Sequence, residues 1–141
     1  MIDIENVVFN TVSNSILNEF PNASIYGESV EVPASFPCVC IVEEDNYTYR
    51  DSQDTSLSEN HSNLMYSVNV YSNKKNGKKT EAKKILGLVD ETMQGMMFTR
   101  ILKSPMPNVD RSIYRISARY TAVVERGKEI NGNIVFQMYR K

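Results

Sequence analysis

The stretch from residue 38 to residue 71 constrains the fold more than any other part of the chain. It contains the apolar run Cys38–Val42, a polar stretch from Asn46 to Asn60, and an alternating run from Leu64 to Tyr71. A continuous apolar run is typical of a strand buried on both faces, and alternation is typical of a strand with one buried face. We therefore expect a strand central in its sheet, a long polar loop, and a second strand.

Alternation also predicts which side chains of two strands face the core. In the strand expected at Leu64–Tyr71, one face carries Leu64, Tyr66, Val68 and Val70. The clearest strand runs from Ile113 to Val124, and its apolar face carries Tyr114, Ile116, Ala118, Tyr120, Ala122 and Val124. Shorter strands are expected at residues 23–32, 98–103 and 134–139, with a polar turn at residues 125–133.

Two further segments have apolar residues at three-to-four spacing, which predicts amphipathic helices. The first follows Asp3 as N-cap and stops at Pro21, and the second runs from Lys78 or Thr80 to Met96. The first buried stripe is Ile4, Val7, Val8, Val12, Ile16, Leu17 and Phe20. The second is Ala82, Ile85, Leu86, Val89, Met93 and Met96 or Met97.

The expected order of elements is α-β-β-β-α-β-β-β. Runs of strands interrupted by two helices predict an α+β domain, with a largely antiparallel sheet covered by helices on one side. The 141 residues fit one domain. We assign residues 1–124 to this domain and residues 125–141 to a C-terminal hairpin or arm of the same domain.

Composition excludes several classes of protein. The net charge of −1 argues against a nucleic-acid binder that works through bulk electrostatics, and no apolar run is long enough to span a membrane. The acidic start, Met1 to Glu5, is unlike a signal peptide, so we expect a cytosolic protein. Cys38 and Cys40 are then expected to be reduced, small core residues that face the same way.

The residues with reactive side chains do not form a recognisable active site. The turn Gly77-Lys78-Lys79-Thr80 lacks the second glycine and the hydroxyl position of a phosphate-binding loop, which favours a solvated turn. His61 is the only histidine, and no serine lies in a nucleophile elbow. Cys38, Cys40 and His61 offer three side chains of the metal-binding type, but a strand Cys-x-Cys lacks the turn geometry of a zinc knuckle. We therefore expect no enzyme activity, no metal and no cofactor.

Charge is distributed unevenly along the chain. Six acids and one base lie between residues 43 and 59, and the acids are Glu43, Glu44, Asp45, Asp51, Asp54 and Glu59. Six lysines and one acid lie between residues 74 and 84, and the lysines are Lys74, Lys75, Lys78, Lys79, Lys83 and Lys84. These segments are either two solvated surfaces or complementary surfaces of neighbouring copies, whose head-to-tail contact builds a ring if it closes.

Other features also suit contacts between proteins. Arg115 and Arg119 lie on the polar face of the clearest strand. In one interpretation, they lie on a solvated face or form ion pairs inside the subunit. In the other, they lie at a subunit interface or in the lumen of a ring. The polar loop from Asn46 to Asn60 is long enough to become ordered against a partner, and sheet edges can pair between copies.

Several extended segments together resemble one family of small bacteriophage and prophage proteins. These segments are residues 36–39, 43–49, 58–61, 64–73 and 113–123. In length and element order the chain looks like the tail terminator, or tail completion, proteins of long-tailed phages, which act in head-tail joining. The resemblance covers residues 1–124 and rests on no single diagnostic motif.

The resemblance implies a small α+β subunit of a homohexameric ring. Such a ring caps the head-proximal end of the tail tube, joins it to the head-tail connector or stopper protein, and lets genome DNA pass without sequence-specific binding. It implies a place at the head-tail junction of the virion after assembly in the host cytoplasm, with no membrane contact. The alternatives are a head-completion or minor capsid or connector protein of the same junction and, more distantly, a small enzyme or regulatory binding domain.

Overall fold

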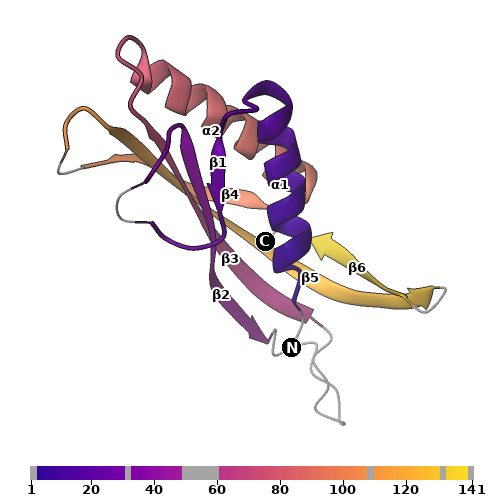
Figure 1. The fold of residues 1–141 in the computed structure, drawn as a ribbon. Helices are drawn as coiled ribbons and strands as arrows, with labels where there is room; N and C mark the ends of the chain where they lie inside the picture. Colours follow the sequence, from indigo (N-terminus) through magenta and orange to yellow (C-terminus); the bar gives the residue numbers. More distant parts are fainter. Residues whose placement is uncertain (1–2, 31–32, 49–60, 108–109, 131–132, 140–141) are drawn as a thin grey trace.

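Figure 1 shows a computed structural model, which describes residues 3–30, 33–48, 61–107, 110–130 and 133–139. Its elements are α1 (Glu5–Glu19), β1 (Ser24–Tyr26), β2 (Cys38–Thr48), β3 (His61–Ser72), α2 (Lys78–Gly95), β4 (Thr99–Met106), β5 (Tyr114–Ile130) and β6 (Asn133–Tyr139). The predicted α+β class and the predicted order of elements are confirmed.

The strands form one sheet in which β1, β2, β3, β5 and β4 lie side by side, and β6 pairs with β5. Only the pairing of β1 with β2 is parallel, and the other pairings are antiparallel. Both helices cover the same face of the sheet (Figure 1). This arrangement confirms the predicted, largely antiparallel sheet with helices on one side.

The main core lies between that face and the two helices. From α2 it takes the predicted residues Ala82, Ile85, Leu86, Val89 and Met93. From β3 and β5 it takes Leu64, Tyr66, Val68, Val70, Ile116, Ala118, Tyr120, Ala122 and Val124. Met96 packs partly against this core, whereas Met97 is 40% exposed. The alternating strands and the second helical stripe were therefore predicted correctly.

The buried stripe of α1 is narrower than predicted. Val7 is 57% exposed and Leu17 is 40% exposed, whereas the fully buried apolar residues of α1 are Val8, Val12 and Ile16. Successive helical residues differ by about 100° around the axis, so one row spaced by four residues faces the sheet and its sequence neighbours point aside. The prediction that Val7 and Leu17 are core residues is wrong.

The start of α1 also differs slightly from the prediction. The N-cap position is occupied by Ile4, which makes no side-chain capping hydrogen bond. Asp3 lies one residue earlier, and its Oδ1 accepts a hydrogen bond from the Glu5 backbone N–H at 3.0 Å. Asp3 therefore contacts the first turn without being the N-cap.

The first two strands correct three expectations. β1 is limited to Ser24–Tyr26, and the described residues of the expected range that flank it, residue 23 and residues 27–30, are not part of a strand. β2 continues to Thr48, because Asn46, Tyr47 and Thr48 pair in register with β3 despite their polarity. The predicted loop therefore begins later than Asn46, and residues 49–60 lie outside the described part of the chain.

The position of β2 in the sheet also differs from the prediction. It has partners on both sides only over Cys38–Cys40, where β1 lies alongside it. From Ile41 onward its only partner among the described residues is β3. The central strands of the sheet are β3 and β5. The apolar run of β2 is explained by the burial of both of its faces, and not by a central position in the sheet.

The strand β4 is longer than predicted and lies at the edge of the sheet. It starts after Phe98, which is fully buried, and continues through Pro105 to Met106. Proline cannot donate a backbone hydrogen bond, and edge strands tolerate it for that reason. The expected end of this strand at residue 103 is therefore three residues too early.

The C-terminal part of the chain forms a long hairpin. β5 continues to Ile130 through most of the expected turn at residues 125–133, with an irregular register between Arg126 and Glu129. β6 pairs with residues 123–130 of β5. Because β3 occupies the other edge of β5 as far as Glu125, β6 lies on the same edge as β4. The hairpin extends away from the body of the domain (Figure 1).

Candidate assembly surfaces

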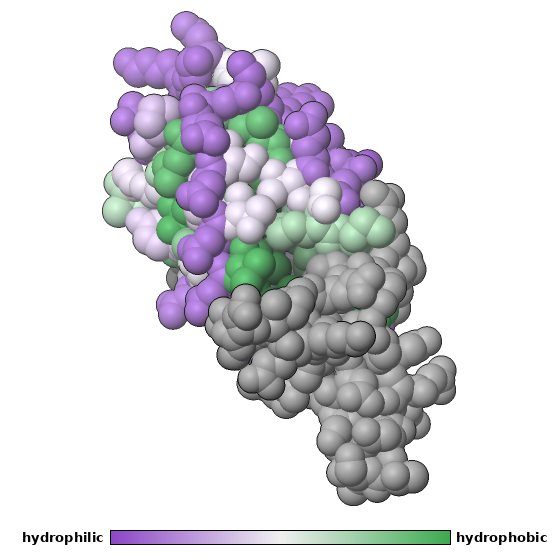
Figure 2. Space-filling view, turned by 90° about the vertical axis from the view of Figure 1, so that its right-hand side faces the viewer, coloured by the Kyte–Doolittle hydropathy of each residue, from purple (hydrophilic) through white to green (hydrophobic). Residues whose placement is uncertain are grey.

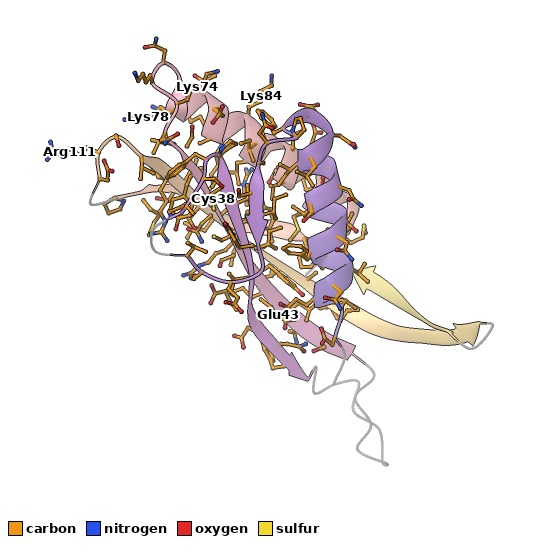
Figure 3. The ribbon with its side chains drawn as sticks, viewed as in Figure 1. Cys38, Glu43, Lys74, Lys78, Lys84 and Arg111 are labelled. Atoms are coloured by element: carbon orange, nitrogen blue, oxygen red, sulfur yellow. The ribbon has the colours of Figure 1, made fainter. Side chains whose placement is uncertain are left out.

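The lysine turn, residues 73–79, joins β3 to α2 at one end of the molecule (Figure 3). Gly77 is the N-cap of α2 and has φ of 94°, a conformation that favours glycine. The Lys78 ammonium donates a hydrogen bond to the Arg111 carbonyl oxygen at 2.7 Å. The exposed lysines of this end are Lys74, Lys75, Lys79, Lys83 and Lys84. The solvated turn expected at Gly77–Thr80 therefore forms a cationic end, and Figure 2 shows the same upper end as hydrophilic.

The acids of β2 lie on both faces of the sheet, because successive side chains of a strand point to opposite faces. Glu43 accepts hydrogen bonds from the Tyr66 hydroxyl at 3.2 Å and the Asn46 amide at 3.4 Å on the helix side. Glu44 accepts one from Ser67 Oγ at 2.6 Å on the other side. The remaining acids of the predicted interface, Asp51, Asp54 and Glu59, lie outside the described residues.

The described acids and lysines lie far from one another within the subunit. Glu43 lies beside the start of α1, whereas Lys74, Lys78 and Lys84 lie at the opposite end (Figure 3). The described members of the two sets therefore do not neutralise one another inside one subunit. Both remain available for contacts with other molecules.

Three carboxylates gather near the start of α1. Ligand oxygens of Asp3, Glu5 and Glu43 lie within 4.8 Å of one another. Oxygen ligands of this kind suit hard cations such as Ca²⁺, but exposed acidic groups often cluster without a metal. Burial, together with the negative charges of Glu5 and Asp3, raises the pKa of Glu43.

Replacing Glu43 by glutamine is expected to make stability less dependent on pH. Burial raises the folded-state pKa of Glu43 above its ordinary value of 4.5, so the folded protein takes up this proton at a higher pH than the unfolded chain does. Its stabilising contribution is fully present below pH 4.5 and is lost as the pH rises through the raised pKa.

Urea unfolding between about pH 4 and about pH 8 measures this effect. Wild type and the control Glu44→Gln, which changes the neighbouring carboxylate on the other face, are expected to lose stability across this range. Glu43→Gln is expected to lose less. An identical loss in all three proteins would contradict the assignment to Glu43.

The two arginines of the predicted interface have different environments. Arg115 lies over the Tyr71 ring, with its Cζ 5.4 Å from the ring centroid, and donates two hydrogen bonds to Asn69 Oδ1 at 3.0 and 3.2 Å. Arg119 is exposed on the same face. Arg115 is therefore engaged within the subunit, whereas Arg119 is accessible to another molecule.

A second, smaller core lies on the face of the sheet away from the helices. Cys38 and Cys40 pack there with Tyr71, and the partly buried side chains around them are Tyr26, Val30, Phe36 and Ile113. Both thiols are free and buried, as expected for small core residues facing the same way. The hydrogen bond between them lowers the pKa of Cys40 to about 7 and raises that of Cys38.

Both thiols are expected to react slowly with a thiol reagent in the native protein. Cys38 is 0% exposed and Cys40 is 1% exposed, so labelling requires local opening of the second core. Reaction with Ellman's reagent is expected to be at least about a hundredfold slower than in concentrated urea. The control Asn14→Cys, at an exposed position of α1, should add one fast-reacting thiol. Fast reaction of two thiols in the native wild type would contradict this packing.

The strand β4 exposes apolar side chains that the sequence reasoning missed. Ile101 is 52% exposed, Leu102 is 45% exposed and Met106 is 40% exposed. A bulge between Arg100 and Leu102 leaves Ile101 out of the pairing with β5. The available signal was Pro105, because a proline within a strand indicates an edge strand.

The residues considered for metal binding are separated along the sheet. His61 is the first residue of β3, whereas Cys40 lies opposite Asn69, eight residues further along β3. At about 3.4 Å per residue, their backbones are roughly 27 Å apart. Cys38, Cys40 and His61 therefore do not form one ligand set.

A hollow of about 310 Å³ lies beside the lysine turn. It is lined by Phe20, Lys74, Asn76, Gly77, Thr80, Glu81 and Lys84. The Glu81 carboxylate accepts a hydrogen bond from Ser72 Oγ at 2.8 Å, which links α2 to β3 below the turn. The lining contains neither histidine nor cysteine, so it does not provide the thiol or imidazole considered above.

No family model and no curated protein matches the chain. Within the described ranges, neither helix is both long enough and apolar enough to cross a membrane. Function is therefore inferred from the sequence and from the placement of charged and apolar side chains.

Proposed function

We propose that this chain is a structural virion protein of the tail-terminator type. Copies form a ring, most simply a homohexamer, that caps the head-proximal end of the tail tube and joins it to the connector or stopper protein. The support from sequence is the set of extended segments that resemble this family, which include most of β3 and the first part of β5.

The observation that carries the proposal is the separation of surfaces on one small subunit. The lysine turn forms one end, Glu43 and its neighbouring carboxylates lie toward the other, and apolar side chains are exposed along the β4 edge. In a ring that joins two different partners, each subunit needs lateral surfaces that contact the neighbouring subunits and two end surfaces that contact the partners. The subunit offers surfaces in each of these directions.

The near-neutral charge of the chain also suits a passage for DNA. Each phosphate contact by a lysine or arginine adds salt-dependent affinity, which slows a strand that has to move through. The net charge of −1 limits such binding. The exposed guanidinium of Arg119 is the side chain to test if retention of DNA is observed.

Mixing the purified protein with polymerising tail tube protein tests the proposal. A terminator is expected to bind one end of each tube and to shorten the tubes as its concentration rises, which electron microscopy measures. Binding to the connector with no effect on tube length would favour a head-completion protein instead. A monomer that binds neither partner would contradict a role at the head-tail junction.

A further inference from the structure

The sheet has two lateral edges that are open among the described residues. On one side β4 forms the edge, and on the other side β2 forms it from Ile41 to Thr48, beyond the short strand β1. These edges belong to opposite sides of the same sheet. A contact between the β4 edge of one copy and the β2 edge of the next is therefore heterologous, and every copy can repeat it.

The register places the two open edges at the same level along the strands. Val42 lies opposite Ser67, Ser67 lies opposite Arg119, and Arg119 lies opposite Leu102. These residues form one row across the sheet, on the face away from the helices. Neighbouring copies related by rotation about an axis along the strands then meet without a shift along that axis. An unshifted contact closes into a ring when its rotation divides a full turn, whereas a shifted contact produces a helical filament.

The side chains at and beside the two ends of this row are complementary. Asp45 lies next to the row on β2, opposite Met65, and Arg119 lies in the row on β5, next to the edge strand. The β4 side presents the exposed apolar residues Ile101 and Leu102, with the exposed guanidinium of Arg119 beside them. The β2 side presents the partly exposed Val42 and the exposed Asp45. Each side therefore has an apolar side chain next to a charged one, and the charges of the two sides have opposite signs. The apolar side chains support packing, and the opposite charges fix the orientation of the two copies.

Both edges carry features that oppose direct strand pairing. β4 has its bulge at Ile101 and contains Lys103 and Pro105, while β2 has its bulge between Glu43 and Asp45. Bulges, charged residues and proline are the usual means by which edge strands avoid adding another strand. The contact between copies is therefore expected to form through side chains at the two bulges and not by a continuous sheet.

We propose that the β4 bulge of one copy packs against the β2 bulge of the next. Leu102 and Ile101 then contact Val42, and Arg119 pairs with Asp45. This inference rests on the proposed ring and identifies the surfaces that build it. It also assigns Asp45 of β2 to Arg119 and not to the lysine turn, which remains on one face of the ring.

Leu102→Glu tests the apolar part of the contact. The wild-type protein is expected to form a closed oligomer, and Leu102→Glu is expected to shift the mass measured by native mass spectrometry to that of a single chain. The matched control is Val7→Glu, which places the same charge on an exposed apolar position of α1 and should leave the oligomer intact. Circular dichroism and urea unfolding establish that both variants are folded.

Charge reversal tests the polar part. Arg119→Glu and Asp45→Lys are each expected to weaken association by at least about tenfold, and the double variant is expected to restore it, because the pair is re-formed with exchanged signs. Single variants that dissociate without restoration in the double variant would overturn the assigned pair.

The outcomes separate this inference from the proposed ring. An oligomeric wild type whose mass is unchanged by Leu102→Glu and by both charge reversals would overturn the inferred contact and leave the ring standing. A wild type that stops at two copies would overturn the heterologous contact. A wild type that is monomeric at all concentrations would overturn both.

Discussion

Replacing Phe98 by alanine is expected to lower the free energy of unfolding by about 3–5 kcal/mol. Phe98 is fully buried, and its ring meets that of Tyr66 edge to face, with the centroids 5.5 Å apart and an interplanar angle of 86°. It also lies where the chain passes from α2 to β4, so its loss leaves a cavity between a helix and two strands. Urea unfolding monitored by circular dichroism measures the effect.

Two variants control for this result. Phe98→Leu keeps most of the apolar volume and should cost clearly less than the alanine variant. Leu17→Ala removes an apolar side chain that is 40% exposed on α1, and its cost should stay within about 1 kcal/mol. A loss below about 1 kcal/mol for Phe98→Ala would contradict its position in the main core.

Replacing Asp90 by alanine is expected to destabilise the protein by about 1–3 kcal/mol. The Asp90 carboxylate accepts hydrogen bonds from the Tyr120 hydroxyl at 3.0 Å, from Arg100 at 3.0 Å and from Gln94 at 2.8 Å. Tyr120 is fully buried, so its hydroxyl is left without its partner when the carboxylate is removed. Most of the loss is therefore expected to come from Tyr120 and not from the more exposed Arg100.

A double-mutant cycle separates these contributions. Tyr120→Phe removes the buried donor, so Asp90→Ala should cost less in that background than in wild type. Arg100→Ala removes a partner whose side chain is 42% exposed, and it should cost less than about 1 kcal/mol. An unchanged cost of Asp90→Ala in the Tyr120→Phe background would contradict the importance of this hydrogen bond.

The sequence predicts the fold well wherever one face of an element is buried. The alternation in β3 and β5 and the stripe of α2 follow directly from burial against one core, because each side chain has a fixed direction along a strand or helix. The limits of the strands are harder to predict. Asn46–Thr48 and most of residues 125–130 are polar and were assigned to a loop or turn, but they belong to strands that pair with their neighbours, with one irregularity between Arg126 and Glu129. Backbone pairing of this kind depends on partners distant in the sequence.

The candidate surfaces were predicted only in part. The sequence identifies the lysine turn and the acids of β2, because runs of like charge are visible without a structure. It does not separate Arg115, which contacts Tyr71 and Asn69, from the exposed Arg119, although both lie on the same face of one strand. It also does not reveal that Ile101 and Leu102 are exposed, because the expected strand ended at residue 103 and left out Pro105, the residue that indicates an edge strand.

The placement of these surfaces gives the assembly hypothesis a physical form. In this hypothesis, contacts between copies run across the sheet, from the β4 edge to the β2 edge. The lysine turn lies at one end of the strands and the carboxylates near α1 lie toward the other, and these are the directions in which the proposed ring would meet its other partners. Interactions at the ends are expected to weaken as salt rises, because exposed charges are screened. Contacts between copies that include Leu102 are expected to weaken less.

Native mass spectrometry of the purified wild-type protein across a range of concentrations tests the central claim most directly. The account predicts a closed oligomer of one size, with a mass close to six times the 16.1 kDa of a single chain. Electron microscopy of the same sample is expected to show rings. A mass of 16.1 kDa at every concentration, with or without tail tube protein, would contradict it.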